Sequence, residues 1–388
     1  MQKAFKYLSI FACSILIILV ILINWNLIKK PSTNEVYYQL QFLKEKRDRG
    51  EPSKMQKLFP EGLMFYESLY GITWAELLNE SNNSKYTVEG QIELRKVSKA
   101  INSIQAKSTF QQNLTIPHGA FYSGWSTYFL SKKIKSDSSN VNEVENFKTR
   151  CEEISFAMTQ SSSPYLESYQ NLYWPADMVV CIAALANHDI IFKPKYFSQI
   201  SEWISKVKSN LDKNGLIPHS ANSDGLVLEP ARGSSQSLIL SFLPEIDSVF
   251  AKEQFLVYKK LFCEERLGLR AIREYPLGSE GNGDIDSGPV IWDIGTAATL
   301  VAQKAAFVNK DFDLSSDLFQ GINALGFPYI SNYQKNFLGG SLPIADAFIA
   351  WSRSRLEPSK FHNNVFWKFH LISILIVSLL TFAIYRFK

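Results

Sequence analysis

The chain has 388 residues, 46% of them hydrophobic and 20% charged, so it is long enough for a large domain and too apolar to be disordered. The formal net charge is only +4 and no dense block of Lys or Arg is present, which argues against nucleic acid as a partner. The four cysteines are far apart and form neither a C-x-x-C motif nor a Cys/His spacing suited to zinc, so we expect buried free thiols and no metal.

The N-terminal segment predicts a transmembrane helix. The 22 positions between Lys6 and Lys29 carry no charge, and a helix of that length spans about 33 Å, enough to cross the core of a bilayer. A cleaved signal peptide is the alternative, but its apolar run is usually about 7–15 residues and ends at a small-x-small site. Residues 25–30 offer no such site, so residues 1–29 are expected to be an uncleaved anchor.

A second apolar run, residues 365–386, predicts a transmembrane helix near the other end. Trp367 and Tyr385 stand where interfacial aromatic residues are expected, and Lys368 and Arg386 can extend to the lipid headgroups. A buried core helix is the alternative, and the closing sequence Tyr-Arg-Phe-Lys argues against it. Two spans place both tails on one side of the membrane, and a short cationic N-terminal tail favours a domain outside the cytoplasm.

The region between the two spans predicts alternating helices of two kinds. Residues 30–59 are expected to form a connector, which includes residues 51–53, and a first outer helix; residues 60–356 are expected to form the main domain. Helices of the first kind are amphipathic, with apolar residues three or four positions apart, and cover residues 35–49, 88–103, 142–158, 196–211, 249–266 and 312–325. Helices of the second kind are apolar on nearly every side and cover residues 61–78, 120–131, 176–186, 234–243, 290–307 and 342–351.

The alternation favours an all-α fold with two concentric rings. A helix that is apolar on every side must be enclosed by other helices. Six enclosed helices between six half-exposed ones predict an (α/α)6 toroid flanked by one transmembrane helix at each end; an irregular helical bundle is the alternative. Little β structure is expected beyond a short hairpin that pairs residues 216–217 with 226–228 across residues 222–225.

The loops that lead into the enclosed helices are the expected place for a site. In such a toroid the inner helices all run in the same direction, so these loops open at one mouth, and loops on a rigid scaffold are where sites are usually built. The first loop places His118 and Tyr122 at a helix start. His118 is a candidate acid or base; the alternative is a cap or a packing residue.

The second loop, residues 165–177, is dense in aromatic residues. Glu167, Tyr173, Trp174 and Asp177 combine aromatic faces with carboxylates, a combination that suits a sugar or a terpene-like substrate. Plain packing explains the aromatic residues equally well, and Asp177 near a helix start also complements the helix dipole.

Two further loops carry charged residues before a helix. Glu229, Arg232 and Gln236 precede or begin one enclosed helix, and Asp284 and Asp286 stand between glycines before another. The two aspartates are candidates for an acid/base or substrate-gripping pair, with helix capping as the alternative. An EF-hand is rejected because no Glu follows at the twelfth position.

The middle of the chain resembles the linalool dehydratase/isomerase-like family, whose fold is an (α/α)6 barrel. The likeness is diffuse and covers about residues 55–351; it is carried by His118-Gly119 before an aromatic helix and by residues 174–186, 215–235, 283–306 and 340–346. The resemblance implies cofactor-free dehydration and isomerisation of a tertiary alcohol by a His, an Asp, tyrosines and a pair of cysteines, and it places the His role on His118. The cysteine pair has no counterpart here, because Cys181 is displaced along its helix. The same toroid also serves glycoside hydrolases and polysaccharide lyases.

Two functions remain open at this point. The first is a membrane-anchored, cofactor-independent enzyme that acts by general acid/base catalysis on a carbohydrate or a lipid-like alcohol, as a lyase, dehydratase or glycoside hydrolase. Its catalytic residues would be His118, Asp177, Asp284 and Asp286, and its substrate-binding residues Tyr122, Glu167, Tyr173, Trp174, Glu229, Arg232 and Gln236. The second is a non-catalytic ligand-binding or scaffold domain of a cell-envelope assembly. In both cases the expected partners are a lipid bilayer and a small-molecule or carbohydrate ligand.

Overall fold

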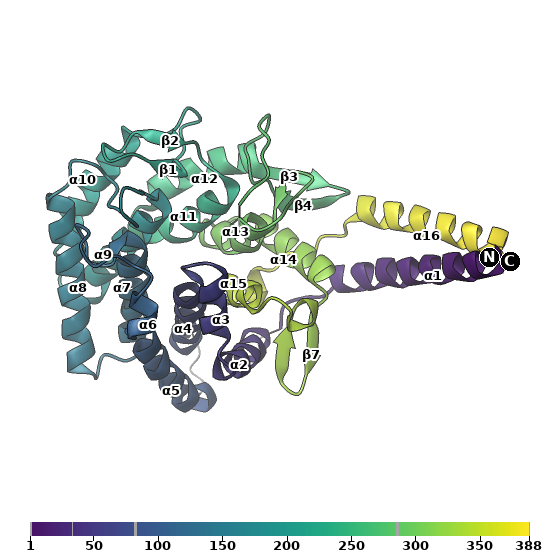
Figure 1. The fold of residues 1–388 in the computed structure, drawn as a ribbon, viewed down its shortest axis with the longest axis horizontal. Coiled ribbons are helices and arrows are strands. Elements are labelled where there is room, and N and C mark those ends of the chain that lie inside the picture. The colour runs from purple at the N-terminus through teal and green to yellow at the C-terminus, as the bar shows by residue number, and fades with distance from the viewer. Residues whose placement is uncertain (1, 33, 81–83, 285–286, 388) are drawn as a thin grey trace.

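Two long apolar helices lie side by side and project from a helical domain (Figure 1). The computed structural model describes residues 2–32, 34–80, 84–284 and 287–387. α1 (Gln2–Leu27) enters the domain and α16 (Trp367–Phe387) leaves it, so that both chain ends lie together at the far tip (Figure 1). By length and composition each helix can cross a membrane. The two predicted apolar helices are thus confirmed.

The paired helices are fixed to each other and to the domain. The Asn24 amide donates a hydrogen bond to Ser373 Oγ over 2.9 Å, and an apolar cluster that includes Leu27 and Ala324 joins their base to α14 (Phe312–Gly326). The Gln320 amide also donates to the Leu27 carbonyl over 2.8 Å. The prediction that α14 faces water on one side is therefore wrong, because the base of the helix pair covers it and residues 314–324 are buried.

The helices expected to be enclosed all form, and most of their side chains are buried. They are α4 (Gly62–Glu80), α7 (Gly119–Ser136), α9 (Pro175–Ile191), α11 (Gly233–Ile246), α13 (Thr296–Val308) and α15 (Pro343–Arg353). Each packs against the next in this order, and α15 packs against α4. We call them the buried helices.

One further helix packs along each buried helix. α2 (Glu35–Asp48) lies on α15, α5 (Ser84–Ile101) on α4, α8 (Val141–Thr159) on α7, α10 (Phe197–Lys208) on α9, α12 (Ser248–Phe262) on α11 and α14 on α13. On α10 the buried residues Ile200, Trp203 and Val207 are three and four positions apart, which places them on one face. Asn140 and Asp247 start α8 and α12 by accepting hydrogen bonds from backbone N–H groups of the first turn.

Two short helices complete the layer outside the buried helices. α3 (Glu51–Leu58) packs on α4, and α6 (Ile104–Lys107) follows α5. Residues 51–53 were expected to be a connector, but they form the first turn of α3. Pro52 is tolerated there because the first turn of a helix does not use that N–H.

The buried helices run in the same direction. Near their first turns, the Ala120 N–H donates to the Glu167 carbonyl over 2.8 Å and the Gly233 N–H to the Glu274 carbonyl over 2.7 Å, so the entry loops of α7, α9, α11 and α13 meet at one end. Near their last turns, Lys132 of α7 contacts Asn187 of α9 and Glu245 of α11.

Aromatic rings fill the space between the buried helices. Trp125 on α7, Phe242 on α11 and Trp351 on α15 have ring centroids 5.5–6.2 Å apart, although these three helices are not neighbours in the packing order. Their contacts therefore cross the interior. Burial of each such side chain contributes about 2–3 kcal/mol, and a site must lie outside this packed interior.

Four short antiparallel hairpins occur among the described residues, all in loops. They are β1 (Ser220–Ala221) with β2 (Val227–Glu229), β3 (Cys263–Arg266) with β4 (Leu269–Ile272), β5 (Val290–Ile291) with β6 (Ile294–Gly295), and β7 (Tyr329–Ser331) with β8 (Gln334–Asn336). The predicted hairpin exists, but its first strand is at 220–221 and not at 216–217, because Leu216 and Ile217 are buried under α12 by bonds to Gln254 and to Asp212. The predicted helix 290–307 starts only at Thr296, since β5 and β6 occupy its first positions.

Candidate functional site

The loops before α9, α11 and α13 meet over the end of the domain where the buried helices begin. The Ala221 N–H donates to the Tyr173 carbonyl over 3.1 Å, and the Gly233 N–H donates to the Glu274 carbonyl over 2.7 Å. The second approach requires a glycine, because a Cβ at Gly233 would lie 1.9 Å from the Arg273 carbonyl oxygen. The close contact fixes Arg232, which precedes Gly233, above the start of α11.

Arg232 is the centre of a group of polar side chains from all three loops. Only 7% of Arg232 is exposed. Its Nε donates to Glu274 Oε1 over 3.1 Å, and its Nη1 donates to Asp284 Oδ2 over 2.7 Å and lies 3.3 Å from His219 Nε2. We call this group the Arg232 cluster; its members are Trp174, His219, Glu229, Arg232, Glu274 and Asp284.

His219 is held neutral in this cluster. Burial, and then the charge of Arg232, lower the pKa of His219 to about 4. Its Nε2 faces a guanidinium donor and therefore accepts, so the hydrogen of the neutral ring is on Nδ1. The imidazole packs against the Trp174 ring at 5.2 Å. Among the described residues neither His219 Nδ1 nor Arg232 Nη2, both buried, has a hydrogen-bond partner. The cluster thus holds two N–H groups that a ligand acceptor could use.

The three carboxylates of the cluster differ in exposure. Glu274 is fully buried, and this burial raises its pKa although Ser234 and Arg232 donate hydrogen bonds to it. Burial also opposes ionisation of Asp284, but hydrogen bonds from the Ser287 backbone and from Arg232 outweigh it and lower the pKa. Glu229 is 56% exposed at the side-chain level, with Oε2 at 3.6 Å from His219 Nε2. The inner part of the site is therefore buried, and exposed carboxylates make its solvent-facing rim acidic.

The rim of the cluster opens to solvent beside the loop that carries Asp284. A shallow hollow there is lined by Asn282, Gly283, Asp284, Gly288 and Pro289. The Tyr275 ring lies 5.4 Å from the Arg232 guanidinium. No group of three or more His, Cys, Asp or Glu side chains suited to a metal ion occurs in the part of the chain that the structure describes.

Two predicted residues lie apart from the cluster, at the start of α7. His118 has a left-handed backbone with φ 67°, and its Nδ1 is 3.4 Å from the Phe110 carbonyl oxygen. Tyr122 donates through its hydroxyl to the Ile101 carbonyl over 3.2 Å, and burial raises its pKa. Both side chains contact the segment that joins α5 to α7. None of their contacts among the described residues reaches Arg232.

The predicted residues around α9 are partly engaged in local bonds. Asp177 is buried and accepts a hydrogen bond from Ser168 Oγ over 2.6 Å, which ties α9 to its own entry loop. Glu167 accepts from the Asn171 N–H over 2.9 Å. Burial and then Glu167 raise the pKa of Tyr173. Glu167 and Tyr173 therefore form a pair that adjoins the cluster through the next residue, Trp174.

The last two predicted residues do not extend the cluster. Gln236 is fully buried and donates to the Ile217 carbonyl, which fixes the loop beneath His219. Asp286 lies outside the described residues. The structure thus brings together Trp174, Glu229, Arg232 and Asp284 of the predicted set.

Sequence reasoning missed two members of the cluster, His219 and Glu274. His219 stands in the loop that was singled out, but His118 at a helix start was preferred. Glu274 lies in a stretch without any motif. The only sequence signal was indirect: a buried Arg needs a carboxylate partner, and the partner of Arg232 had to come from another loop.

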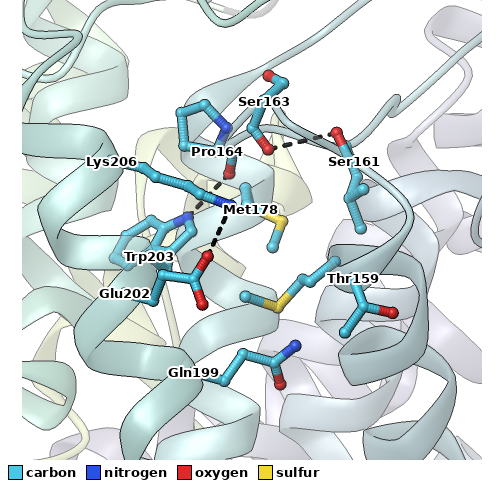
Figure 2. A pocket seen from close by; sticks show the side chains of 11 residues that line it. Thr159, Ser161, Ser163, Pro164, Met178, Gln199, Glu202, Trp203 and Lys206 are labelled. Carbon is cyan, nitrogen blue, oxygen red and sulfur yellow. Dashed lines mark hydrogen bonds and ion pairs between the residues drawn. The ribbon is translucent and has the colours of Figure 1, made fainter.

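A separate cavity of about 220 Å³ lies between α8, α10 and the loop before α9 (Figure 2). It is lined mainly by Met158, Met178, Trp203 and polar surface residues. The Trp203 indole donates to the Pro164 carbonyl over 2.8 Å, and Lys206 pairs with Glu202 over 2.9 Å (Figure 2). The cavity contains no residue of the Arg232 cluster, and its charged residues are paired at its rim, so it is not the candidate site.

Lower pH is expected to destabilise the protein through His219. Its folded pKa is about 4 and its ordinary value 6.5, so between these values the unfolded chain takes up a proton that the folded chain does not. The stabilisation by the neutral ring is complete above pH 6.5 and is lost towards pH 4, by about 3 kcal/mol at most. Thermal unfolding at about pH 7.5 and about pH 4.5 should show a larger loss for the wild type than for His219→Asn, and equal losses would contradict the burial of a neutral ring.

Comparisons with known proteins do not assign the chain to a family. No family model matches the chain, and a search of curated proteins finds no similar sequence. Its function is therefore argued from the Arg232 cluster itself.

Proposed function

We propose that α1 and α16 span a membrane and that the domain between them is an (α/α)6 toroid outside the cytoplasm. The alternating layers, the packing of α15 back onto α4 and the shared direction of the buried helices support the toroid. The apolar surface of the two helices and the position of both termini at the same tip support the two spans (Figure 1). Kinship with the linalool dehydratase/isomerase-like family is part of the same proposal.

For the function, we propose that the Arg232 cluster binds a hydroxyl-rich ligand that carries a carboxylate, such as an acidic carbohydrate. The observation that carries the proposal is the pair of buried N–H donors, Arg232 Nη2 and His219 Nδ1, that have no partner among the described residues. A buried polar group without a partner costs about 1–3 kcal/mol, and a ligand acceptor would remove that cost. A guanidinium fork matches a carboxylate, and Trp174 offers an aromatic face next to it.

The geometry of the cluster leaves one side of the Arg232 guanidinium for a ligand carboxylate that enters from the rim. Asp284, which is 46% exposed at the side-chain level, already presents a carboxylate to Arg232 Nη1. Asp284 therefore occupies one side of the guanidinium, and a ligand carboxylate would take the other. Fully buried Glu274 holds the guanidinium in place from below.

Ligand binding is expected to depend on Arg232. Titration calorimetry would compare a galacturonic acid trisaccharide with the neutral galactose trisaccharide on the full-length protein in nanodiscs. The wild type should prefer the acidic sugar, and Arg232→Gln should bind it about thirtyfold more weakly, which corresponds to about 2 kcal/mol for a charge-assisted bond. The surface variant Arg95→Gln, which removes the same charge from an exposed position of α5, should bind as the wild type does.

Arg232→Gln also leaves Glu274 without its partner, which can destabilise the fold. A second variant therefore separates a loss of binding from a loss of stability. His219→Phe removes one of the two donors and keeps both the ring and the ion pair; it should weaken binding of the acidic sugar by about fivefold to tenfold. Equal binding of both sugars, or affinities in both variants equal to that of the wild type, would overturn the proposal.

A general acid/base enzyme is the second candidate, and one observation favours it. Glu229 is an exposed carboxylate whose Oε2 lies 3.6 Å from a neutral imidazole and 3.9 Å from the Arg232 guanidinium. It is therefore placed to exchange a proton with a ligand held by Arg232. Under this reading Glu229→Gln abolishes product formation, as followed by mass spectrometry of the acidic trisaccharide, and leaves binding within about threefold. If the wild type releases no product, the domain is a binding module.

A further inference from the structure

A groove lined by tyrosines lies at the opposite edge of the domain from the Arg232 cluster. It has a volume of about 400 Å³, within the range of about 300–1,000 Å³ that is usual for small-molecule sites. The groove lies between the start of α2, the start of α5 and the tip of the β7–β8 hairpin. In Figure 1 α2 and β7 are at one edge of the domain, and β1 and β2 are at the other.

Four aromatic rings form the faces of the groove. Tyr37 and Tyr86 have ring centroids 4.5 Å apart, and Tyr38 and Tyr333 have ring centroids 5.9 Å apart. Tyr333 is 74% exposed. A large aromatic face that is open to solvent next to three further rings gives a ligand apolar surface to pack on.

The remaining lining residues all carry side-chain amides: Asn34, Gln41, Asn332 and Gln334. Each amide has both a donor and an acceptor, so the set can bond hydroxyl groups in either sense. None of the lining residues is charged. The groove is thus built for a neutral, hydroxyl-rich ligand and not for a phosphate or a carboxylate.

The rings are held in place from beneath by a carboxylate. Glu89 accepts hydrogen bonds from the Tyr37 hydroxyl over 3.0 Å and from the Gln41 amide over 3.1 Å, and it pairs with Lys44 over 2.6 Å. The Tyr86 hydroxyl donates to Asn34 Oδ1 over 3.0 Å. Burial and then the hydrogen bond to Glu89 raise the pKa of Tyr37 to about 12, so the phenol remains protonated. The side chains are therefore arranged before any ligand arrives.

Tyr333, the second residue at the tip of the hairpin, has a backbone conformation that a tyrosine does not favour. Asn332 has φ 50° and Tyr333 has φ 60°, which are the angles of a two-residue type I′ turn. Glycine is the usual second residue of that turn, and a left-handed tyrosine costs about 1–2 kcal/mol. The ring of Tyr333 lines the groove beside Tyr38 in spite of this backbone strain. The strain is consistent with a role of the ring in ligand binding.

We propose that this tyrosine groove binds a neutral carbohydrate. The C–H faces of a pyranose pack on the tyrosine rings, and its hydroxyls bond the amides at the rim. The proposal does not depend on the Arg232 cluster. α2 starts soon after α1 ends, and β7 follows α14, which contacts α1. The groove is therefore near the base of the helix pair, within reach of a glycolipid headgroup as well as of a free oligosaccharide.

The test uses the full-length protein in phosphatidylcholine nanodiscs, without sugar-based detergent. The probes are maltotriose and cellotriose in solution, and glucosyl diacylglycerol added to the lipid. Binding is measured by saturation-transfer NMR and titration. We expect at least one probe to bind. Tyr333→Ala should weaken that binding about tenfold, or 1.4 kcal/mol, and Tyr333→Phe, which keeps the ring, should restore it.

Tyr329→Ala is the matched control, because Tyr329 is a 62% exposed tyrosine of the same hairpin that does not line the groove. It should bind as the wild type does. Binding of free trisaccharides identifies a soluble glycan as the ligand, and binding of the glycolipid alone identifies a headgroup. The proposal is overturned if no probe binds, or if Tyr333→Ala and Tyr38→Ala both bind as tightly as the wild type.

Discussion

Replacing Lys304 by methionine is expected to lower the free energy of unfolding by about 3–5 kcal/mol, because it leaves a buried carboxylate without its counterion. Lys304 on α13 donates to Glu76 Oε2 over 2.8 Å and to the Trp351 carbonyl over 3.2 Å. The side chains of Lys304 and Glu76 are only 3% and 5% exposed. Unfolding in detergent, followed by near-UV circular dichroism, measures the change.

Two comparisons separate the burial effect from the loss of a charge. Glu76→Gln combined with Lys304→Met removes both charges, and it should recover much of the lost stability. Lys206→Met removes the exposed pair with Glu202 and should change stability by less than about 1 kcal/mol. A Lys304→Met variant as stable as the wild type would mean that the two groups are not paired in the folded protein.

The size of this effect follows from the place of Lys304 in the fold. Its contacts join α13 to α4 and α15, while Lys132 and Glu245 join α7 to α11 over 2.8 Å. The positive charge of Lys132, and then the hydrogen bond that Lys132 donates to Glu245, outweigh the effect of burial. Together they lower the pKa of the Glu245 carboxyl to about 2. Buried charges thus link the last turns of the buried helices.

Replacing Gly119 by alanine is expected to cost about 3 kcal/mol or more. Gly119 has φ 77°, and a Cβ there would lie 2.1 Å from the Ser168 carbonyl oxygen. The substitution thus combines a left-handed backbone, at about 1–2 kcal/mol, with a clash against main-chain atoms that cannot rotate away. To relieve the clash, the loop that carries Glu167 and Trp174 would have to move, so binding at the Arg232 cluster should fall as well.

Gly215→Ala is the matched control for Gly119→Ala. Gly215 has nearly the same φ, 78°, but nothing lies within 4 Å of the Cβ position. Its cost should be the backbone strain alone, about 1–2 kcal/mol. The two variants should therefore differ clearly in their thermal midpoints, and equal midpoints would contradict the close approach between α7 and the loop before α9.

The helices could be predicted because their periodicity is local. Apolar residues three and four apart mark the amphipathic helices, and nearly unbroken apolar runs mark the buried ones. The cover over α14 could not be predicted in this way, since it comes from the bases of α1 and α16, far away in the sequence. The other three hairpins were missed because strands of two to four residues are too short to show an alternating pattern.

The candidate site was only partly predictable for a related reason. The entry loops were identified correctly as a common end of the domain, and Arg232 and Asp284 do meet there. Which histidine joins them depends on side-chain direction: His118 turns towards Phe110, while His219 turns towards Arg232. A sequence shows which residues share a loop, but it does not show where each side chain points.

A structure of the full-length protein with the galacturonic acid trisaccharide bound is the most direct measurement of what the Arg232 cluster does. A sugar carboxylate should lie within hydrogen-bond distance of the Arg232 guanidinium, with the His219 N–H on a sugar oxygen and a pyranose face near Trp174. A complex in which the acidic sugar is bound elsewhere, with the Arg232 cluster unchanged and without ligand, would contradict the proposed function.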